Sequence, residues 1–141
     1  MNAVFLDASA IIYLLEGEPG IQRATRNVLT DLRSGDPEPA IVVSALSLLE
    51  CRVHPIRTGD EARLERFDHF FANPGLAIVE LDGNVIERAT RLRARHGIRT
   101  PDALQAASAL TLPENPAIVT GDKDFKKIPE LNVHLIAAPS T

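Results

Sequence analysis

Short apolar runs alternate with longer amphipathic segments along this chain. The apolar runs are rich in β-branched residues, end at polar or turn-forming residues, and span residues 4–6, 40–43, 76–79, 117–120 and 133–136. Runs that are apolar throughout are typical of short strands buried on both faces of a sheet. We therefore predict a strand at each of these positions.

Segments with apolar residues at helical spacing lie between the runs, and they span residues 8–15, 21–32, 46–53, 60–71, 85–96 and 100–109. Breaks are expected at Pro19-Gly20, at His54-Pro55 and at Gly97, and Thr100 is expected to cap the last helix. A short helical turn at 124–128 and a loose C-terminal tail complete the pattern. Apolar strands that alternate with helices predict an α/β fold with a parallel sheet covered on both faces.

Length and composition fit one ordinary globular domain over residues 1–141. The chain has 141 residues, of which 45% are hydrophobic and 24% charged. It has no internal repeat, no long linker and no apolar run of membrane-spanning length. The apolar stretch near the start is interrupted by Asp7 and lacks a basic leader, which argues against a signal peptide.

Net charge and cysteine content limit the functions that the chain can have. A net charge of −4 argues against broad non-specific nucleic-acid binding but leaves room for a local basic groove. The single cysteine, Cys51, fits a reduced, cytoplasmic setting and a small buried side chain. The scattered histidines give no zinc-finger spacing.

Acidic residues follow two of the predicted strands. Asp7 comes directly after the first, and Gly121, Asp122, Lys123 and Asp124 follow the fourth. In an open parallel sheet, ligands bind beyond the carboxyl ends of the strands, so both positions are candidates for a site. Alternatives stay open, because Gly-Asp is common in turns and an aspartate that caps a helix contributes about 1 kcal/mol. Ser9 is a second possible cap for the first helix.

Two further acids lie on predicted helices. Glu50 falls within an apolar stripe of Leu46, Leu49 and Val53, so we expect it to be buried with a partner. That partner is either a metal or an arginine such as Arg52. Asp102 lies in the first turn of a helix of small apolar residues, where the helix dipole alone favours an acid.

Together these acids predict a cation site. Four converging carboxylates repel one another unless a cation neutralises them, and sites built from carboxylate oxygens suit Mg²⁺ or Mn²⁺. One or two such ions activate water for in-line hydrolysis of a phosphodiester. No serine, cysteine or histidine in the sequence is placed to serve as a better nucleophile.

The same residues resemble a known family. The apolar strand into Asp7-Ala8-Ser9, the internal Glu50, the run from Thr100 to Ala107 and the run from Thr120 to Phe125 are similar to PIN-domain proteins, in particular the VapC ribonuclease toxins of toxin–antitoxin pairs. The resemblance covers almost the whole chain. It implies a three-layer α/β/α sandwich, a divalent-metal site and cleavage of single-stranded RNA.

The resemblance also assigns roles to individual residues. It implies catalytic metal ligands at Asp7, Glu50, Asp102 and Asp122, an auxiliary ligand at Asp124, and small polar helpers at Ser9 and Thr120. It further implies a homodimer and an antitoxin partner. An arginine-bearing antitoxin segment that reaches the carboxylates would compete with the metal, since both neutralise the same charges.

Basic residues near these acids are candidates for RNA contact. An arginine-rich stretch precedes Asp102, and the candidates are Arg52, Arg95, Arg99 and Lys123. The alternative is a solvated helix face, as is usual for such stretches.

Other functions remain open on the sequence alone. A phosphotransfer domain also places an aspartate after a parallel strand, but the dehalogenase-type pattern requires a second aspartate where this chain has Ser9. A non-catalytic RNA- or protein-binding module on the same fold is a further alternative. We expect a metal-dependent endoribonuclease, and metal-dependent RNA cleavage by the pure protein would distinguish it from both.

Overall fold

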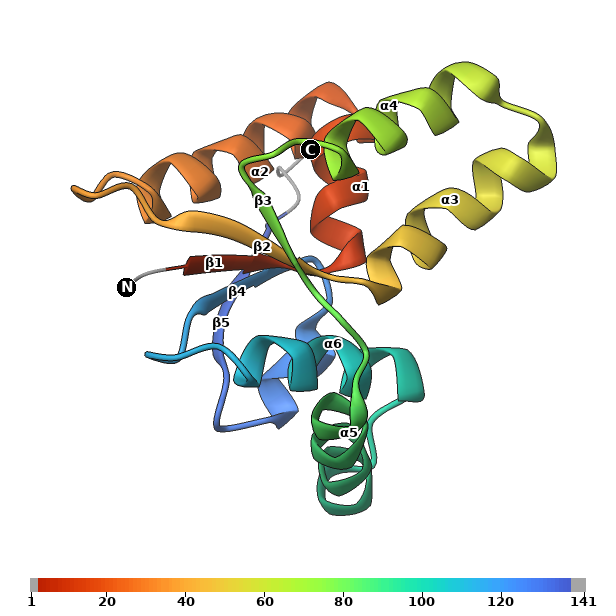
Figure 1. Cartoon of the computed structure of the whole chain (residues 1–141). Helices are drawn as coiled ribbons and strands as arrows, with labels where there is room; N and C mark the ends of the chain where they lie inside the picture. The colour runs from red at the N-terminus through yellow and green to blue at the C-terminus, as the bar shows by residue number, and fades with distance from the viewer. Residues whose placement is uncertain (1–2, 138–141) are drawn as a thin grey trace.

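A five-stranded parallel sheet forms the centre of the molecule (Figure 1). The computed structural model describes residues 3–137, so the predicted C-terminal tail lies mostly outside the described residues. The strands are β1 (Ala3–Leu6), β2 (Ala40–Ser44), β3 (Leu76–Val79), β4 (Ala117–Thr120) and β5 (Asn132–Leu135). All pairings are parallel, and the strand order is β3-β2-β1-β4-β5. The strands predicted from the apolar runs are confirmed.

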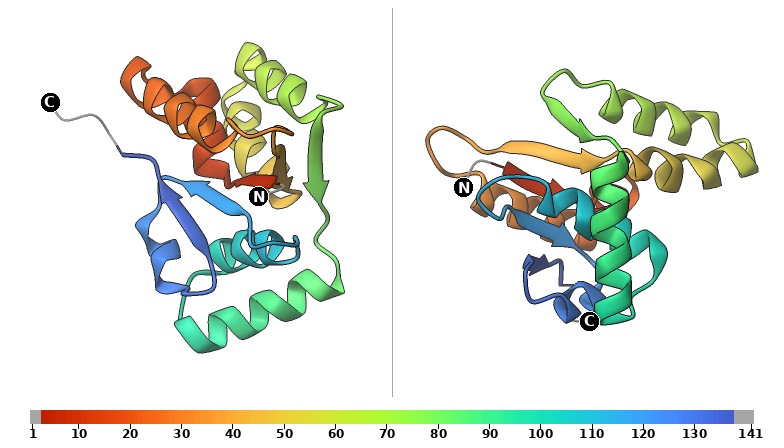
Figure 2. Two further views of the ribbon diagram at one scale, coloured as in Figure 1. Left: turned by 90° about the vertical axis from the view of Figure 1, so that its left-hand side faces the viewer. Right: turned by 60° about the horizontal axis from the view of Figure 1, so that its bottom comes forward.

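Helices cover both faces of this sheet, as Figure 2 shows. One layer contains α1 (Ala8–Glu16), α2 (Pro19–Leu32), α3 (Leu46–Thr58) and α4 (Glu61–Phe71). The other contains α5 (Gly83–His96), α6 (Thr100–Leu110) and the short 3₁₀ helix η1 (Lys123–Lys127). Alternate residues of β1 enter the two cores: Val4 and Leu6 face the first layer, and Phe5 faces the second. The predicted three-layer α/β/α sandwich is confirmed.

Three helix ends differ from the prediction. Helix α2 begins at Pro19. Proline suits the first turn of a helix, because the N–H groups there have no hydrogen-bond partner within the helix. Helix α3 passes through Pro55 and ends at Gly59, whose φ of 70° is the left-handed conformation that stops a helix. Helix α6 has Arg99 rather than Thr100 at its N-cap position, without a capping side-chain bond.

The apolar stripe predicted for α3 does not face the core, so that prediction is wrong. The buried residues of this helix are Ser47, Cys51 and Pro55. Leu49, Val53 and Ile56 are instead 62%, 44% and 56% exposed and line a surface groove of about 590 Å³. We call these three residues the α3 apolar face. Cys51 is buried, as predicted for a small side chain, and burial raises the pKa of its thiol to about 12.

The strand order places a switch point between β1 and β4. The chain moves from β1 outward to β2 and β3, then returns to the other side of β1 for β4 and β5. Leu6 is paired with Val119, so the residues that follow the two strands begin side by side. In open α/β sheets the crevice at this point is where ligands bind. No helix among residues 3–137 is long and apolar enough to span a membrane.

Candidate metal centre

A hydrogen-bonded network joins the ends of β1 and β4 around Asp7. Oδ1 of Asp7 accepts from the backbone N–H of Ala10 at 2.9 Å and from the Ser9 hydroxyl at 2.7 Å, while Oδ2 accepts from the Thr120 hydroxyl. Asp7 is therefore the N-cap of α1, and Ser9 supports it rather than replacing it. The structure brings Ser9 and Thr120 to Asp7, as their predicted helper role requires.

The same network continues into the loop after β4. The backbone N–H of Gly121 donates to the Ser9 hydroxyl at 2.9 Å, and that of Asp122 donates to the Thr120 hydroxyl at 3.0 Å. Oδ1 of Asp122 accepts from the backbone N–H of Asp124 at 2.9 Å and so caps η1. A Cβ at Gly121 would lie 2.4 Å from the Tyr13 ring, which explains why a glycine stands here.

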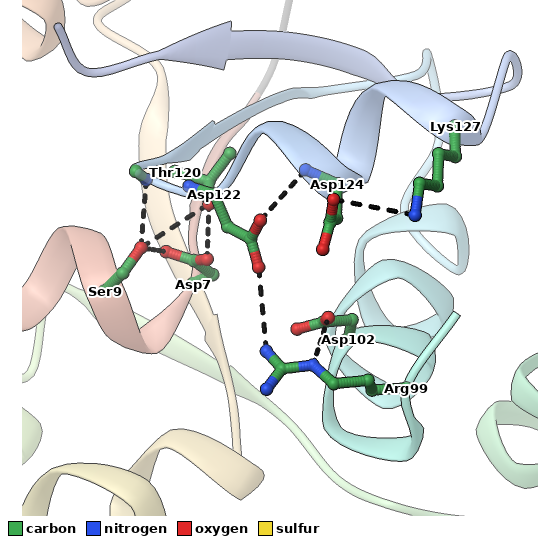
Figure 3. Close-up of polar contacts among 9 residues, drawn as sticks. Asp7, Ser9, Arg99, Asp102, Thr120, Asp122, Asp124 and Lys127 are labelled. Carbon is green, nitrogen blue, oxygen red and sulfur yellow. Dashed lines mark hydrogen bonds and ion pairs between the residues drawn. The ribbon is translucent and has the colours of Figure 1, made fainter.

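Three carboxylates converge beside this network (Figure 3). One oxygen from each of Asp102, Asp122 and Asp124 lies within 4.8 Å of the other two, and we call these residues the acid cluster. Asp102 reaches it from the first turn of α6, and the other two come from the start of η1. A set of carboxylate oxygens fits a hard divalent cation such as Mg²⁺ or Mn²⁺. The cluster thus includes Asp124, which the sequence suggested only as an auxiliary ligand.

Glu50 lies outside the acid cluster, and its hydrogen-bond partner is Gln105 rather than the expected Arg52. Oε1 of Glu50 accepts from the Gln105 carboxamide at 2.8 Å, whereas Arg52 pairs with Asp68. Gln105 is 2% exposed and also donates to the Ser47 hydroxyl at 3.0 Å. Sequence reasoning missed the role of Gln105. The available signal was a long polar side chain in an otherwise small, apolar helix, one turn after Asp102.

Burial raises the pKa of three of these acids. Desolvation is the main cause for Asp7, Glu50 and Asp102, because it disfavours the charged form. The acids also act on one another: the charge of Glu50 raises the pKa of Asp7, and that of Asp102 raises the pKa of Glu50. The charges of the acid cluster, Glu50 and Asp7 therefore interact, and a bound cation would reduce the repulsion among them.

The candidate RNA-binding residues have different surroundings. Arg99 lies against the acid cluster and pairs with Asp102 and Asp122. Arg95 pairs with Glu130, and Lys123 is exposed between the two aspartates of the loop. Arg93, in the same basic stretch, donates to the carbonyl of Ile98 and the hydroxyl of Thr100, so it holds the turn between α5 and α6.

The model of the PIN domain family matches residues 4–131. The chain belongs to the PIN domain family. This match covers both strands of the switch point and all five candidate acids, and it disfavours the phosphotransfer alternative. No curated protein matches the chain.

Several solved structures share the PIN fold of this chain. A toxin–antitoxin complex from Klebsiella pneumoniae has 22% identity, a TM-score of 0.70, and covers 97% of this chain and 99% of its own. VapBC2 from Rickettsia felis, bound to a DNA fragment from its promoter, has 22% identity, a TM-score of 0.73 and coverages of 94% and 98%. VapC20 from Mycobacterium tuberculosis, a Sarcin-Ricin loop cleaving toxin, has 16% identity, a TM-score of 0.74 and coverages of 93% and 98%.

Proposed function

We propose that this PIN-domain chain is a divalent-metal-dependent endoribonuclease that cleaves single-stranded RNA and serves as the toxin of a toxin–antitoxin pair. The observation that carries the proposal is the acid cluster beside Asp7 at the switch point of the sheet, with Glu50 close enough for the charge of Asp102 to raise its pKa. Supporting it, VapC20, a structural neighbour, is a Sarcin-Ricin loop cleaving toxin.

In this proposal the acids have different roles. Asp102, Asp122 and Asp124 hold the cation, and Asp7, oriented by Ser9 and Thr120, completes its surroundings. A bound Mg²⁺ or Mn²⁺ supplies charge stabilisation at the phosphate and lowers the pKa of water. Glu50 has one oxygen fixed by Gln105, which leaves Oε2 to accept the proton of the attacking water. Burial raises the pKa of Glu50, which makes its carboxylate a stronger proton acceptor.

Basic side chains around the site supply the contacts to RNA. Arg99 and Lys123 adjoin the acid cluster, and Arg52 and Arg95 are more distant candidates on α3 and α5. Contacts to phosphate position the strand without reading its sequence.

We also propose two protein partners. The antitoxin follows from neighbours that are toxin–antitoxin complexes, and an arginine of its tail would pair with the acid cluster in competition with metal. The second partner is another copy of this chain, which would cover the α3 apolar face. The buried Cys51 is consistent with a reduced cytoplasmic compartment.

Cleavage of single-stranded RNA by the purified protein tests this function. We expect cleavage with Mg²⁺ or Mn²⁺, none with chelator, and none from Asp122→Asn or Asp102→Asn with either metal. Asp82→Asn is the matched control, because Asp82 caps α5 as an exposed aspartate outside the site. Cleavage that persists in chelator, or that survives both site substitutions, would contradict the proposal.

A further inference from the structure

Arg99 occupies an unusual position for a cation. It precedes the first turn of α6, where the helix dipole repels positive charge and favours acids. Its Nε nevertheless lies 3.2 Å from Oδ2 of Asp102, and Nη2 lies 3.7 Å from Oδ2 of Asp122 (Figure 3). The acid cluster, rather than the helix, accounts for the placement of this guanidinium.

The guanidinium bridges two elements of the acid cluster. Asp102 belongs to α6 and Asp122 to the loop before η1, and a planar guanidinium with several donors can serve both carboxylates at once. Lys127 also approaches the cluster, but it pairs with Asp124 alone, at 3.6 Å. Arg99 is thus the cation that joins the two sides of the cluster.

A divalent cation bound to the acid cluster needs lone pairs of the same two carboxylates. Arg99 and the metal therefore compete for the charge of Asp102 and Asp122. The Arg99 side chain is 72% exposed, so it can leave the cluster without disrupting the core. Once displaced it remains tethered at the start of α6, beside the site, with its donors free.

We propose that Arg99 is a built-in counter-ion of the metal centre, which holds Asp102 and Asp122 together without metal and is displaced onto an RNA phosphate when metal binds. This inference rests on the proposed metal-dependent function, and it adds a direct link between metal loading and RNA binding. Arg99 acts on the metal through Asp102 and Asp122, so it is a positioning residue.

Calorimetric titration of the metal-free protein with Mn²⁺ tests the competition. Arg99→Ala should bind Mn²⁺ about threefold to tenfold more tightly than the parent, as expected when exposed ion pairs are removed. The gain should shrink at high salt, because salt screens exposed charges. Arg99→Lys, which keeps the charge but loses the planar fork, should fall between the two.

Arg91→Ala is the matched control for this titration. Arg91 is 69% exposed and pairs with Glu87 on α5, so its loss removes the same charge without touching the acid cluster. It should leave Mn²⁺ affinity unchanged. Equal or weaker Mn²⁺ binding by Arg99→Ala would overturn the counter-ion role alone, whereas no Mn²⁺ binding by any variant or the parent would contradict the metal-dependent function as well.

Binding of a phosphorothioate single-stranded RNA tests the displacement. Fluorescence anisotropy should show that Arg99→Ala weakens RNA binding in Mn²⁺ but changes it little in chelator, where the parent guanidinium is already engaged by the acids. An equal loss in both conditions, or no loss in either, would show that Arg99 is not exchanged between carboxylates and phosphate.

Discussion

At the scale of single residues, the structure leaves Asp7 able to serve both as a helix cap and as a site residue, which the sequence presents as alternatives. One carboxylate oxygen caps α1, and the other faces Thr120 at the switch point. A capping pattern in a sequence shows only which backbone N–H a side chain can reach, so it cannot exclude a second role for the other carboxylate oxygen. Both candidate roles of Asp7 are therefore compatible with the structure.

Replacing Asp7 with asparagine should separate fold from function. Burial raises the pKa of Asp7 above its ordinary 3.8, so folding favours the neutral form. Asp7 therefore contributes stability below pH 3.8 and loses it as the pH rises through its folded pKa. In chelator at neutral pH, Asp7→Asn should melt no lower than the parent. Any gain in melting temperature over the parent should disappear toward about pH 4. RNA cleavage should fall about a hundredfold or more.

Thermal melts across pH and a cleavage assay check this, with Asp82→Asn as the control. Asp82 also caps a helix, through the N–H of Val85 at 2.9 Å, but it is exposed. Its substitution should affect neither the pH dependence nor cleavage. A lower melting temperature for Asp7→Asn together with full activity would show that Asp7 is only a cap.

Gln105 is the residue whose role the sequence did not reveal, because its partner Glu50 is 55 positions away in the chain. The Gln105 hydrogen bond lowers the pKa of Glu50, against the larger effect of burial. Gln105→Leu should therefore raise the pKa of Glu50, move the acidic limb of the pH–rate profile upward, and reduce cleavage about 10- to 100-fold.

The control for Gln105 is Ser108→Ala, on the same helix. Ser108 donates to the carbonyl of Leu104 and contacts the Ser44 hydroxyl at 3.1 Å, away from the acids. Ser108→Ala should lower the free energy of unfolding without shifting the pH–rate profile. If Gln105→Leu also leaves the profile in place, Gln105 only packs α6 against α3.

At the scale of elements, strands were easier to predict than helix ends. A strand buried on both faces is apolar throughout, as β4 is, and the partly exposed strands β2 and β3 are also apolar enough to show their positions directly in the sequence. Helix ends depend on which neighbours satisfy the last backbone groups. Helix α3 continues through the buried Pro55 and ends at Gly59. The α/β alternation thus predicts the layers, whereas tertiary contacts decide the boundaries.

Metal binding should tie α6 to η1. Asp102 lies on the first and Asp122 caps the second, so a cation held by both connects two elements that are otherwise separate in the chain. Mn²⁺ at about 100 times its dissociation constant should stabilise the protein by about 2.7 kcal/mol. Differential scanning calorimetry should register this as a rise of roughly 5 to 10 °C in melting temperature.

Asp122→Asn should lose most of this rise, while Asp60→Asn should keep it. Asp60 is an N-cap aspartate too, accepting from the N–H of Arg63 at 3.1 Å on α4, far from the acid cluster in sequence and role. Equal stabilisation of both variants by Mn²⁺ would place the cation elsewhere in the protein.

At the scale of the whole molecule, the location of the candidate site follows from the order of the strands. Acids after two strands predict a site only if those strands are neighbours, and the order β2-β1-β4 makes them so. The position of Asp102 beside Asp122 depends on how α6 packs, which no local pattern specifies. The amphipathic pattern of α3 was misassigned for a related reason: an apolar stripe has the same sequence whether the core or another chain covers it.

The α3 apolar face makes a prediction about assembly. Leu49, Val53 and Ile56 follow the i, i+4, i+7 spacing that packs one helix against another, and a two-fold dimer brings the same face of two copies together. The protein should therefore sediment at about twice 15.3 kDa, and the double substitution Leu49→Asp/Val53→Asp should give the monomer. Because both side chains are exposed, the variant should keep its fold, with an unchanged far-UV circular dichroism spectrum. Ala62→Asp, at an exposed position on α4, is the control and should remain dimeric. A monomeric parent, or a dimer that survives the double substitution, would contradict self-association through α3 and leave this face to a different partner.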